Sequence, residues 1–293
     1  MKTVIPDFYE NFICKAGDCK HSCCKGWEID IDEDSASYYQ TITSDFGEKL
    51  KDSIYTDEEG AHYKLTKEER CPFLREDNLC EMILKIGEES LCDICALHPR
   101  FFEDYTLPSN NYFEPVELAG VGLSCEKVCE LLWETDVPLR FYFCDEDGFI
   151  TEDEFHFEIQ NTLYQPNLSK DYVSKLLLLF QKTEAIDETW SAEISELITQ
   201  IDDVINKAKQ KETTYDSMRY QRLFHYITYR QLDSVDDMNV LKEYATRCTD
   251  FIYLWDAFFS GKNGYDTLES IRRFSEQIEY STENVAIICK KAF

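Results

Sequence analysis

The spacing of the cysteine residues constrains this chain more than any other feature of its sequence. The segment ICKAGDCKHSCCKGWEIDI, residues 13–31, contains four cysteines within eleven positions: Cys14, Cys19, Cys23 and Cys24. Four thiols this close together fit either a disulfide scaffold or a metal centre. Loop spacings of this length let successive thiolates turn toward one centre, and Gly17 and Gly26 permit the tight turns that this needs.

The amino terminus helps to choose between these two alternatives. It reads MKTVIPDFYENF, with one lysine followed by Pro6 and Asp7, and it lacks the apolar stretch of a signal peptide. We therefore expect a cytoplasmic protein, in which thiols stay reduced and a disulfide scaffold does not form. No apolar run approaches the roughly 18 to 20 residues of a membrane-spanning helix, so we expect no membrane association. The dense thiols are thus predicted to bind a metal.

The cysteines are concentrated in the first half of the chain. Eleven of the thirteen precede residue 145, and only Cys248 and Cys289 follow it. The composition changes just after the turn-like sequence DEDG at 145–148. We therefore predict a cysteine-rich metal-binding region over residues 1–148 and a helical bundle over residues 149–293.

The second half has the periodicity of helices. A T-E-D-E capping box at 151–154 predicts a helix start, with Phe155 and Ile159 facing inward. In LSKDYVSKLLLLFQK, apolar residues fall at the i, i+3, i+4 and i+7 positions of one helical face: Val173, Leu176, Leu177 and Phe180. Further helices are expected over residues 192–210, 217–232, 236–259 and 267–278.

The first half predicts shorter elements. Residues 34–51 have a helical pattern, and short strands are expected within 61–66, 112–118 and 139–143. SCEKVCELLW at 124–133 predicts a helix with Ser124 as its N-cap. The fold class is therefore mainly α, with an irregular cysteine-rich first half that contains a few short strands, followed by an all-helical bundle.

Thiolates are soft ligands that select Zn²⁺, Cu(I) or iron–sulfur centres. Besides the quartet, the residues that we predict to bind metal are Cys71, Cys80 and Cys95, while Cys92 and Cys125 stay undecided. Zinc fingers need paired CxxC knuckles, and Cys92-x2-Cys95 is the single CxxC here. We expect the four remaining cysteines to be ordinary core residues: Cys129, Cys144, Cys248 and Cys289.

The net charge of −28 bears on the choice of partner. A surface this acidic repels phosphate backbones, so we expect no nucleic acid partner. It attracts cationic ligands or a lysine-bearing protein, although the charge also has a simpler explanation in solubility alone.

Three segments together resemble the flagellin lysine-N-methylases, a cysteine-rich bacterial family related more loosely to zinc- or iron-chelating domain proteins. They are FICKAGDCKHSCCKGWEIDID, CPFLREDNLCEMILKIGEESLCDICALHPRF and LSCEKVCELL. The similarity covers roughly residues 8–135 and continues more faintly through YQRLFHYITYRQ at 220–231.

This resemblance implies a cytoplasmic enzyme that transfers methyl groups from S-adenosylmethionine to lysine side chains of flagellin or another protein. It also implies a [4Fe–4S] cluster bound by cysteines of the amino-terminal motif, with zinc as the alternative metal. The ligand candidates that it implies are Cys14, Cys19, Cys23 and Cys24. Four more cysteines fall at cysteine positions of the family pattern: Cys71, Cys80, Cys95 and Cys125. Eight thiols exceed the four that one cluster takes, so some are structural or a second site exists.

Catalytic and cofactor-binding residues are not identified by the sequence. VELAGVGLSCEKV at 116–128 contains Gly120-x-Gly122 between a predicted strand and a helix, but a lone GxG is a weak cofactor motif. We expect the glycines to relieve a close approach instead. His98 stands where the family pattern has an aromatic residue, which favours packing over metal binding. Two other functions stay open: a non-enzymatic zinc or iron–sulfur sensor, and an iron–sulfur oxidoreductase.

Overall fold

The computed structural model describes residues 1–108, 113–145, 147–211, 216–262 and 264–290. The chain forms two compact units. We call residues Ile13–Arg100 the cysteine unit, and Met1–Phe12 together with Phe101–Phe293 the large unit.

A five-stranded mixed sheet forms one part of the large unit. Its strands in spatial order are β5 (Arg100–Pro108), β6 (Phe113–Val121), β1 (Lys2–Pro6), β7 (Phe141–Cys144) and β8 (Ile150–Glu154). The amino-terminal strand β1 lies in the middle, parallel to β6 and antiparallel to β7. The first residues of the chain are thereby fixed between strands that follow more than a hundred residues later.

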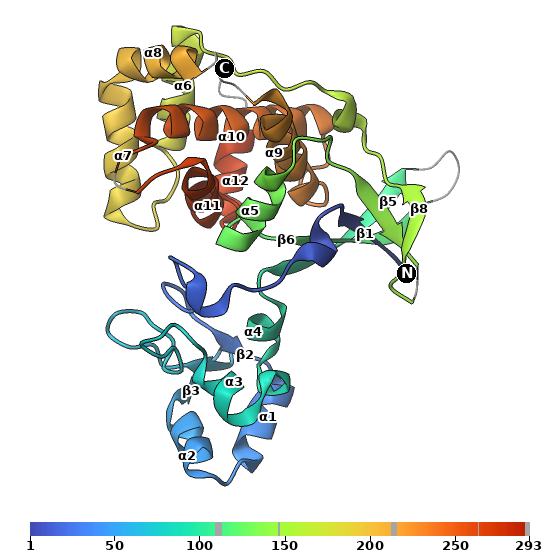
Figure 1. The fold of residues 1–293 in the computed structure, drawn as a ribbon, viewed down its shortest axis with the longest axis vertical. Coiled ribbons are helices and arrows are strands. Elements are labelled where there is room, and N and C mark those ends of the chain that lie inside the picture. Colours follow the sequence, from blue (N-terminus) through green and yellow to red (C-terminus); the bar gives the residue numbers. More distant parts are fainter. Residues whose placement is uncertain (109–112, 146, 212–215, 263, 291–293) are drawn as a thin grey trace. The chain divides into compact units, whose positions relative to one another are not determined.

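Helices make up most of the large unit. They are α5 (Glu126–Glu134), α6 (Lys170–Phe180), α7 (Glu188–Thr199), α8 (Ile201–Lys211), α9 (Ser217–Arg230), α10 (Met238–Phe259), α11 (Thr267–Ile278) and α12 (Thr282–Cys289). Helix α10 is buried along most of its length and contacts α6, α8, α9, α11 and α12, and Figure 1 shows it running through the middle of these helices. It is therefore the central element of the bundle.

Helix α9 joins this bundle to the sheet through two buried tyrosines. The Tyr229 hydroxyl lies 2.8 Å from the carbonyl oxygen of Val4 in β1 and 3.0 Å from that of Ala119 in β6. The Tyr226 hydroxyl donates to the carbonyl of Val121 and accepts from its N–H. Each buried phenol thus has a hydrogen-bond partner, as burial of a polar group requires.

The cysteine unit contains short elements. They are β2 (Asp30–Ile31), α1 (Glu33–Thr41), α2 (Asp45–Asp52), β3 (Ile54–Thr56), β4 (Ala61–Tyr63), α3 (Glu81–Ile86) and α4 (Asp93–Leu97). The three strands form a sheet of order β2-β4-β3. The unit has its own apolar core, in which Ile31, Tyr63 and Phe73 pack with cysteine side chains.

The predicted mainly α fold class is confirmed. Helices α6, α9, α10 and α11 lie where the periodicity placed them, and the four apolar residues of the predicted face of α6 are buried. Residues 192–210 instead form parts of two helices, α7 and α8, which are separated at Gln200.

Two predicted helix starts are wrong. The capping box at 151–154 lies in β8, because pairing with β7 outweighs a short local helix signal. Phe155 and Ile159 are nevertheless buried. Ser124 is not an N-cap: α5 starts one residue later, after Cys125, and the Ser124 hydroxyl bonds instead to that of Tyr280 at 3.2 Å.

The division into units differs from the predicted boundary at residues 148 and 149. The units separate at residues 12 and 13 and at residues 100 and 101, because β1, β6 and β7 pair within one sheet. The predicted boundary describes a change in cysteine content and in helix length, and it stays a prediction.

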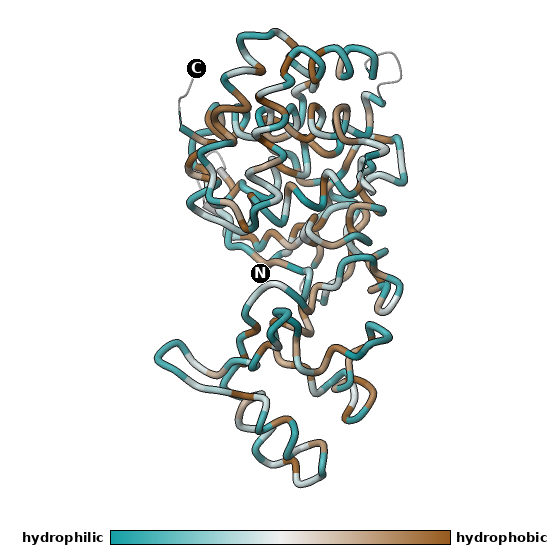
Figure 2. The backbone as a smooth tube through the Cα atoms, turned by 90° about the vertical axis from the view of Figure 1, so that its left-hand side faces the viewer, coloured by the Kyte–Doolittle hydropathy of each residue, from teal (hydrophilic) through white to brown (hydrophobic). Residues whose placement is uncertain are grey.

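Hydrophobic and hydrophilic residues are mixed along the helices, as Figure 2 shows. Within the described ranges, no helix combines the length and the apolar character that crossing a bilayer would require.

We predict that Arg222→Ala destabilises the protein strongly. The Arg222 side chain is fully buried in α9, where it pairs with both carboxylate oxygens of Asp7 at 3.0 and 3.1 Å and donates to the carbonyls of Leu132 and Val137. Its removal leaves buried acceptors unpaired, which costs about 3–5 kcal/mol. Urea unfolding measures this loss. The control Lys175→Ala breaks an exposed pair with Asp171 and should cost at most about 1 kcal/mol; equal losses in both variants would contradict the prediction.

A second prediction concerns Asp250, whose carboxylate accepts from the hydroxyls of Tyr164 and Tyr172, both at 2.7 Å. Burial raises the pKa of Asp250 to about 7 although both tyrosines oppose the shift. Between about pH 4 and 7 the Asp250 carboxyl therefore keeps a proton in the folded state that it has lost in the unfolded state. Because the folded state binds more protons, the free energy of unfolding decreases as pH rises through this range.

Asp250→Asn cannot titrate, so its free energy of unfolding relative to the wild type should increase with pH over that window, by at most about 1.4 kcal/mol per pH unit. Denaturation at several pH values measures this difference. Ser174→Ala removes a hydroxyl of α6 that cannot titrate, so it is the control and should give a difference that does not change with pH. A difference for Asp250→Asn that is equally constant would contradict the prediction.

Candidate metal centre

Backbone pairing brings Cys24 next to Cys71 in the cysteine unit. Lys25 and Arg70 form an antiparallel bridge, and it is flanked by two hydrogen bonds. The N–H of Cys71 donates to the carbonyl of Cys24, and that of Gly26 donates to the carbonyl of Glu69, both at 2.9 Å. Two segments that are nearly fifty residues apart in the sequence therefore lie side by side.

A hairpin then brings in Cys80. Leu74 and Cys80 form a second antiparallel bridge, and the N–H of Arg75 donates to the carbonyl of Leu79 at 3.0 Å. The turn between them contains Asn78 with a positive φ of 59°, a conformation that asparagine tolerates better than most residues. Cys80 then precedes α3 as its N-cap residue.

The third segment supplies Cys92 and Cys95. Cys92 is the N-cap residue of the short helix α4, and the N–H of Cys95 donates to its carbonyl at 3.0 Å. One turn of helix therefore separates the two thiols. The carboxylate of Asp32 fixes the start of this helix, because it accepts from the N–H of Asp93 at 2.9 Å while it also caps α1.

These segments form one group of thiols, which we call the five-thiol cluster: Cys24, Cys71, Cys80, Cys92 and Cys95. All five belong to the same apolar core. Electrostatic interactions link them, since the pKa of Cys95 is raised by Cys92, Cys24 and Cys71, and that of Cys80 is raised by Cys24 and Cys92. The structure thus brings together four predicted ligands and adds Cys92, which the sequence had left undecided.

The thiols of the cluster differ in acidity. A hydrogen bond from Cys23 lowers the pKa of Cys24 to about 7, against the effect of burial and with help from Ser22, Arg70 and Lys25. Burial raises the pKa of Cys71 to about 12. A hydrogen bond with Cys92, together with burial, raises the pKa of Cys95 as well. Cys24 is therefore the thiol that is most readily available as a thiolate.

The adjacent residues Cys23 and Cys24 differ in burial and in their contacts. Cys23 is exposed and hydrogen-bonds the sulfur of Cys24, which is half-buried. The indole N–H of Trp27 donates to the carbonyl of Cys23 at 2.7 Å, and the Trp27 ring stacks on His98 with centroids 6.2 Å apart. His98 is thus a packed histidine whose pKa is lowered by burial.

Four predicted ligands are not members of the five-thiol cluster: Cys14, Cys19, Cys23 and Cys125. Cys14 is exposed and accepts a hydrogen bond from the N–H of Ala16, and Cys19 is half-buried. The loop between them packs tightly on the hairpin turn, since a Cβ at Gly17 would stand 3.0 Å from the carbonyl oxygen of Asp77. Cys125 belongs to the large unit, where it precedes α5 and packs on the main core.

The four cysteines expected to be ordinary core residues lie in apolar surroundings. Cys129, Cys144 and Cys248 are buried, and Cys289 packs partly buried against the main core. This prediction is confirmed. Gly120, in β6, has a packing role, as expected for the Gly120-x-Gly122 sequence. A Cβ at this position would stand 2.3 Å from the ring of Phe101 and 3.0 Å from the Tyr226 hydroxyl.

The spacing of the sulfurs bears on the kind of metal centre. Around one tetrahedral zinc ion the sulfurs of neighbouring ligands are about 3.8 Å apart, as Zn–S bonds of about 2.3 Å require. Among the described residues, the single group of three potential ligand atoms within 4.8 Å of one another contains no cysteine. As they stand in this structure, the thiols of the five-thiol cluster therefore do not form a closed tetrahedral zinc site.

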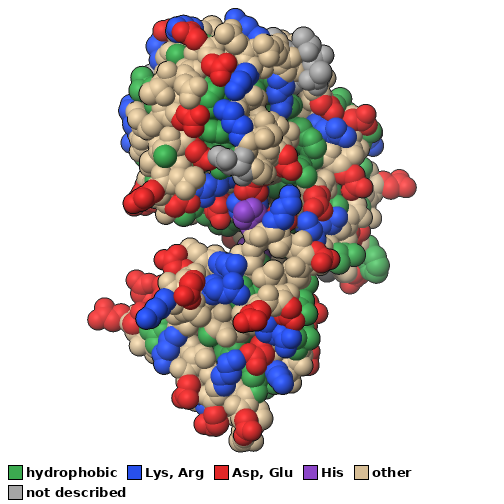
Figure 3. Space-filling model, turned by 60° about the vertical axis from the view of Figure 1, so that its left-hand side comes forward, with side chains coloured by type: hydrophobic (Ala, Val, Ile, Leu, Met, Phe, Trp, Pro, Cys, Tyr) green, Lys and Arg blue, Asp and Glu red, His purple; other side chains and the backbone are tan. Residues whose placement is uncertain are grey.

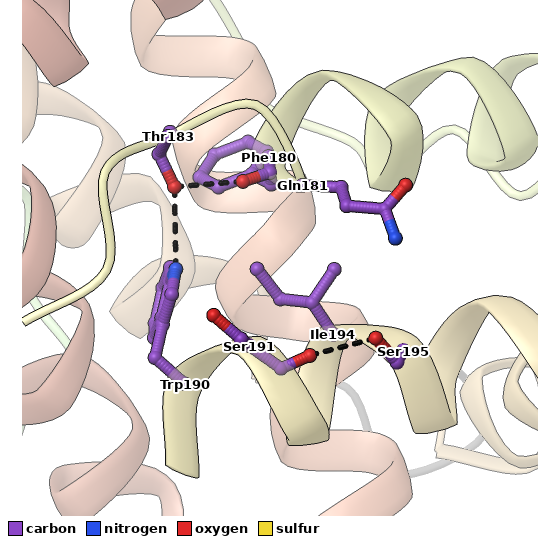
Figure 4. A pocket seen from close by; sticks show the side chains of 7 residues that line it. All are labelled: Phe180, Gln181, Thr183, Trp190, Ser191, Ile194 and Ser195. Atoms are coloured by element: carbon purple, nitrogen blue, oxygen red, sulfur yellow. Dashed lines mark hydrogen bonds between the residues drawn. The ribbon is translucent and has the colours of Figure 1, made fainter. Parts of the chain in front are cut away.

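A small pocket lies elsewhere, between α6 and α7 of the large unit. It is lined by Phe180, Thr183, Trp190 and Ile194 among others, and Figure 4 shows the indole of Trp190 bonded to the Thr183 hydroxyl. Its volume of about 80 Å³ is far below that of a typical cofactor site. The pocket is best explained as a packing defect at the edge of the bundle.

The chain is similar in sequence to proteins of Salmonella. It is similar to proteins named lysine-N-methylase from Salmonella choleraesuis and Salmonella typhimurium, each 30% identical over 135 residues, which is 42% of this chain and 30% of those proteins. It is also similar to the flagellar biosynthetic protein FliU of Salmonella muenchen, 29% identical over 42% of this chain and 72% of that protein.

The matched region thus spans less than a third of the two lysine-N-methylases. No family model and no solved structure matches the chain. The comparisons establish a relation to these proteins at low identity.

We predict that the thiols of the reduced, metal-free protein react in order of their exposure. Cys14 is exposed, whereas Cys92 is fully buried and Cys71 is 7% exposed. An alkylating reagent should therefore modify Cys14 well before Cys92, since a buried thiol reacts only after local unfolding. Time-resolved mass spectrometry of tryptic peptides measures the rates. Alkylation in urea is the control, in which the difference should vanish; equal rates in the folded protein would contradict the burial of Cys92.

Proposed function

We propose that this protein is an S-adenosylmethionine-dependent methyltransferase that acts on lysine side chains of a protein such as flagellin. Its support is the relation to proteins named lysine-N-methylase and flagellar biosynthetic protein FliU. Because the matched region is a minor part of the two lysine-N-methylases, the activity, the substrate and the cytoplasmic location belong to the proposal.

We further propose that four thiols of the five-thiol cluster hold a [4Fe–4S] cluster. The observation that carries this proposal is the convergence of Cys24, Cys71, Cys80, Cys92 and Cys95 from separate segments of the chain into one core. In a [4Fe–4S] cluster each thiolate binds a different iron atom. This suits the five thiols, since no three of their sulfurs lie within 4.8 Å of one another. When bound, the cluster cross-links the segments and supplies redox capacity.

The ligand set therefore shifts from the amino-terminal quartet toward the later cysteines. Cys24 is the member of the quartet that belongs to the five-thiol cluster, and its lowered pKa favours metal binding because the thiolate is the ligand. Cys23 supports it by donating a hydrogen bond to its sulfur. Such second-shell contacts tune a bound metal.

The surface charge suits a cationic substrate. The net charge is −28, and Figure 3 shows acidic side chains spread over both units on the visible face, with basic ones among them. A field of this sign raises the local concentration of lysine-rich protein segments and speeds their association at low salt. Methyl transfer itself requires a neutral lysine amine, so the reaction site must lower the substrate pKa by desolvation.

The experiment combines metal analysis with a transfer assay. Anaerobically purified protein should contain iron and sulfide and show the broad visible absorbance of an iron–sulfur cluster. Cys95→Ser and Cys71→Ser should each remove most of the iron, because both thiols belong to the five-thiol cluster. Cys289→Ser, a half-buried thiol of the large unit, is the matched control and should keep the metal. Retained iron in both cluster variants would overturn the ligand assignment.

Methyl transfer is tested separately with labelled S-adenosylmethionine and flagellin, followed by mass spectrometry of lysine residues. Methylated lysines with wild-type protein support the enzyme. A protein that contains its cluster yet neither binds S-adenosylmethionine in calorimetry nor methylates flagellin would instead be a metal-binding sensor. If the protein contains zinc in place of iron and sulfide, the proposal of a [4Fe–4S] cluster is wrong. The transfer assay then decides the methyltransferase proposal by itself.

A further inference from the structure

The small sheet of the cysteine unit has two faces of different character. Side chains alternate along β2 and β4, so Ile31 and Tyr63 face the core that contains the thiols. Asp30 and His62 are paired across the strands, and Tyr55 of β3 pairs with His62 on its other side. These three side chains therefore share the face of the sheet opposite to the five-thiol cluster.

His62 is at the centre of this second face and is only 3% exposed. Its Nδ1 lies 2.9 Å from Oδ1 of Asp30 and 3.8 Å from Oε1 of Glu28. Its Nε2 lies 3.1 Å from Oδ1 of Asp57. Three carboxylates thus surround one buried imidazole.

This arrangement requires either a doubly protonated imidazole or a metal ion at one of its two nitrogens. A neutral imidazole donates from one nitrogen only, yet both nitrogens of His62 face carboxylate oxygens. With the proton on Nε2 and directed to Asp57, the lone pair of Nδ1 points at Asp30 and meets negative charge. Either a second proton or a metal ion must lie there.

The position of Glu28 supplies the third ligand atom that a metal ion at Nδ1 would use. Its Oε1 is 3.8 Å from Nδ1, too far to accept a hydrogen bond from it, so a proton on Nδ1 bonds Asp30 alone. Nevertheless the ligand atoms of Glu28, Asp30 and His62 all lie within 4.8 Å of one another. One ion with bonds of about 2.0–2.2 Å to nitrogen and oxygen reaches all three after small side-chain movements.

We propose that Glu28, Asp30 and Nδ1 of His62 bind one divalent transition-metal ion. The groups around them have the form of a second shell. Asp57 accepts from Nε2, which fixes the ring and its tautomer as carboxylates do in histidine metal sites. The Tyr55 hydroxyl donates to Glu28, and its ring stacks on His62 with centroids 5.1 Å apart.

The donor set indicates the class of metal. One imidazole nitrogen and two carboxylate oxygens suit Mn²⁺, Fe²⁺ or Zn²⁺, whereas thiolates select Zn²⁺, Cu(I) or iron–sulfur centres. The two sites of the cysteine unit therefore differ in chemical preference. This proposal is independent of the methyltransferase proposal, since it concerns different residues and a different metal.

Mn²⁺ is the probe that separates the two sites, because it prefers oxygen and imidazole ligands over thiolates. The full chain is titrated with Mn²⁺, and the loss of the electron paramagnetic resonance signal of the free ion counts the bound metal. We expect one saturable site per chain. His62→Gln should remove it, and Asp57→Asn should weaken it by about 10- to 100-fold through loss of the second-shell contact.

Two further variants keep the test decisive if His62→Gln does not fold. Glu28→Gln replaces a half-exposed side chain at little risk to the fold and should weaken Mn²⁺ binding by at least about tenfold. Glu58→Gln changes an exposed acid outside the group and is the matched control, with unchanged binding expected. The proposal would be overturned if the wild type had no saturable site, or if Glu28→Gln and Glu58→Gln bound Mn²⁺ equally. His62 would then be a doubly protonated imidazole between the carboxylates.

Discussion

The antiparallel pairing of residues 24–26 with residues 69–71 is the constraint on which the cysteine unit depends. This unit has few long elements, so its core rests on contacts between loops and short helices. The hydrogen bond from Cys71 to the carbonyl of Cys24 places two thiols together through backbone groups alone. The hairpin of Cys80 and the turn of α4 then add the remaining thiols to the same core. The arrangement of the sulfurs thus follows from the backbone.

The burial of several thiols in one core makes their ionisation unfavourable. Burial and neighbouring negative sulfurs raise the pKa of Cys71, Cys80 and Cys95, which disfavours their charged forms. A bound metal reverses this effect, because it replaces the protons and neutralises the charge. A metal bound by these thiols would therefore stabilise the folded state, and metal content would then be coupled to the stability of this unit.

The sequence predicted those parts of the structure that depend on local periodicity. Helices such as α6 and α10 bury a stripe of residues at the 3.6-residue period, and that stripe is visible without knowledge of the fold. Strand β8 was missed because a four-residue capping box is a weak signal beside pairing with β7. The cysteines were predicted to bind metal because of their density, but the way in which they group in the core was not predicted. Neighbours in the chain such as Cys14 and Cys24 differ in burial, whereas Cys24 and Cys71 meet through tertiary pairing.

The same reasoning explains why the carboxylate and histidine group was absent from the sequence-based predictions. Its residues come from the segment that leads into β2, from β2 and β4, and from the turn before β4, and His62 has no motif spacing to Glu28 or Asp30. A signal does exist, since the alternation in GWEIDID places Glu28 and Asp30 on one face of a strand and Ile29 and Ile31 on the other. One face of a small sheet thereby meets the thiols, and the other presents an imidazole and carboxylates. Because ligand softness selects the metal, a single short strand can separate two metal chemistries within one unit.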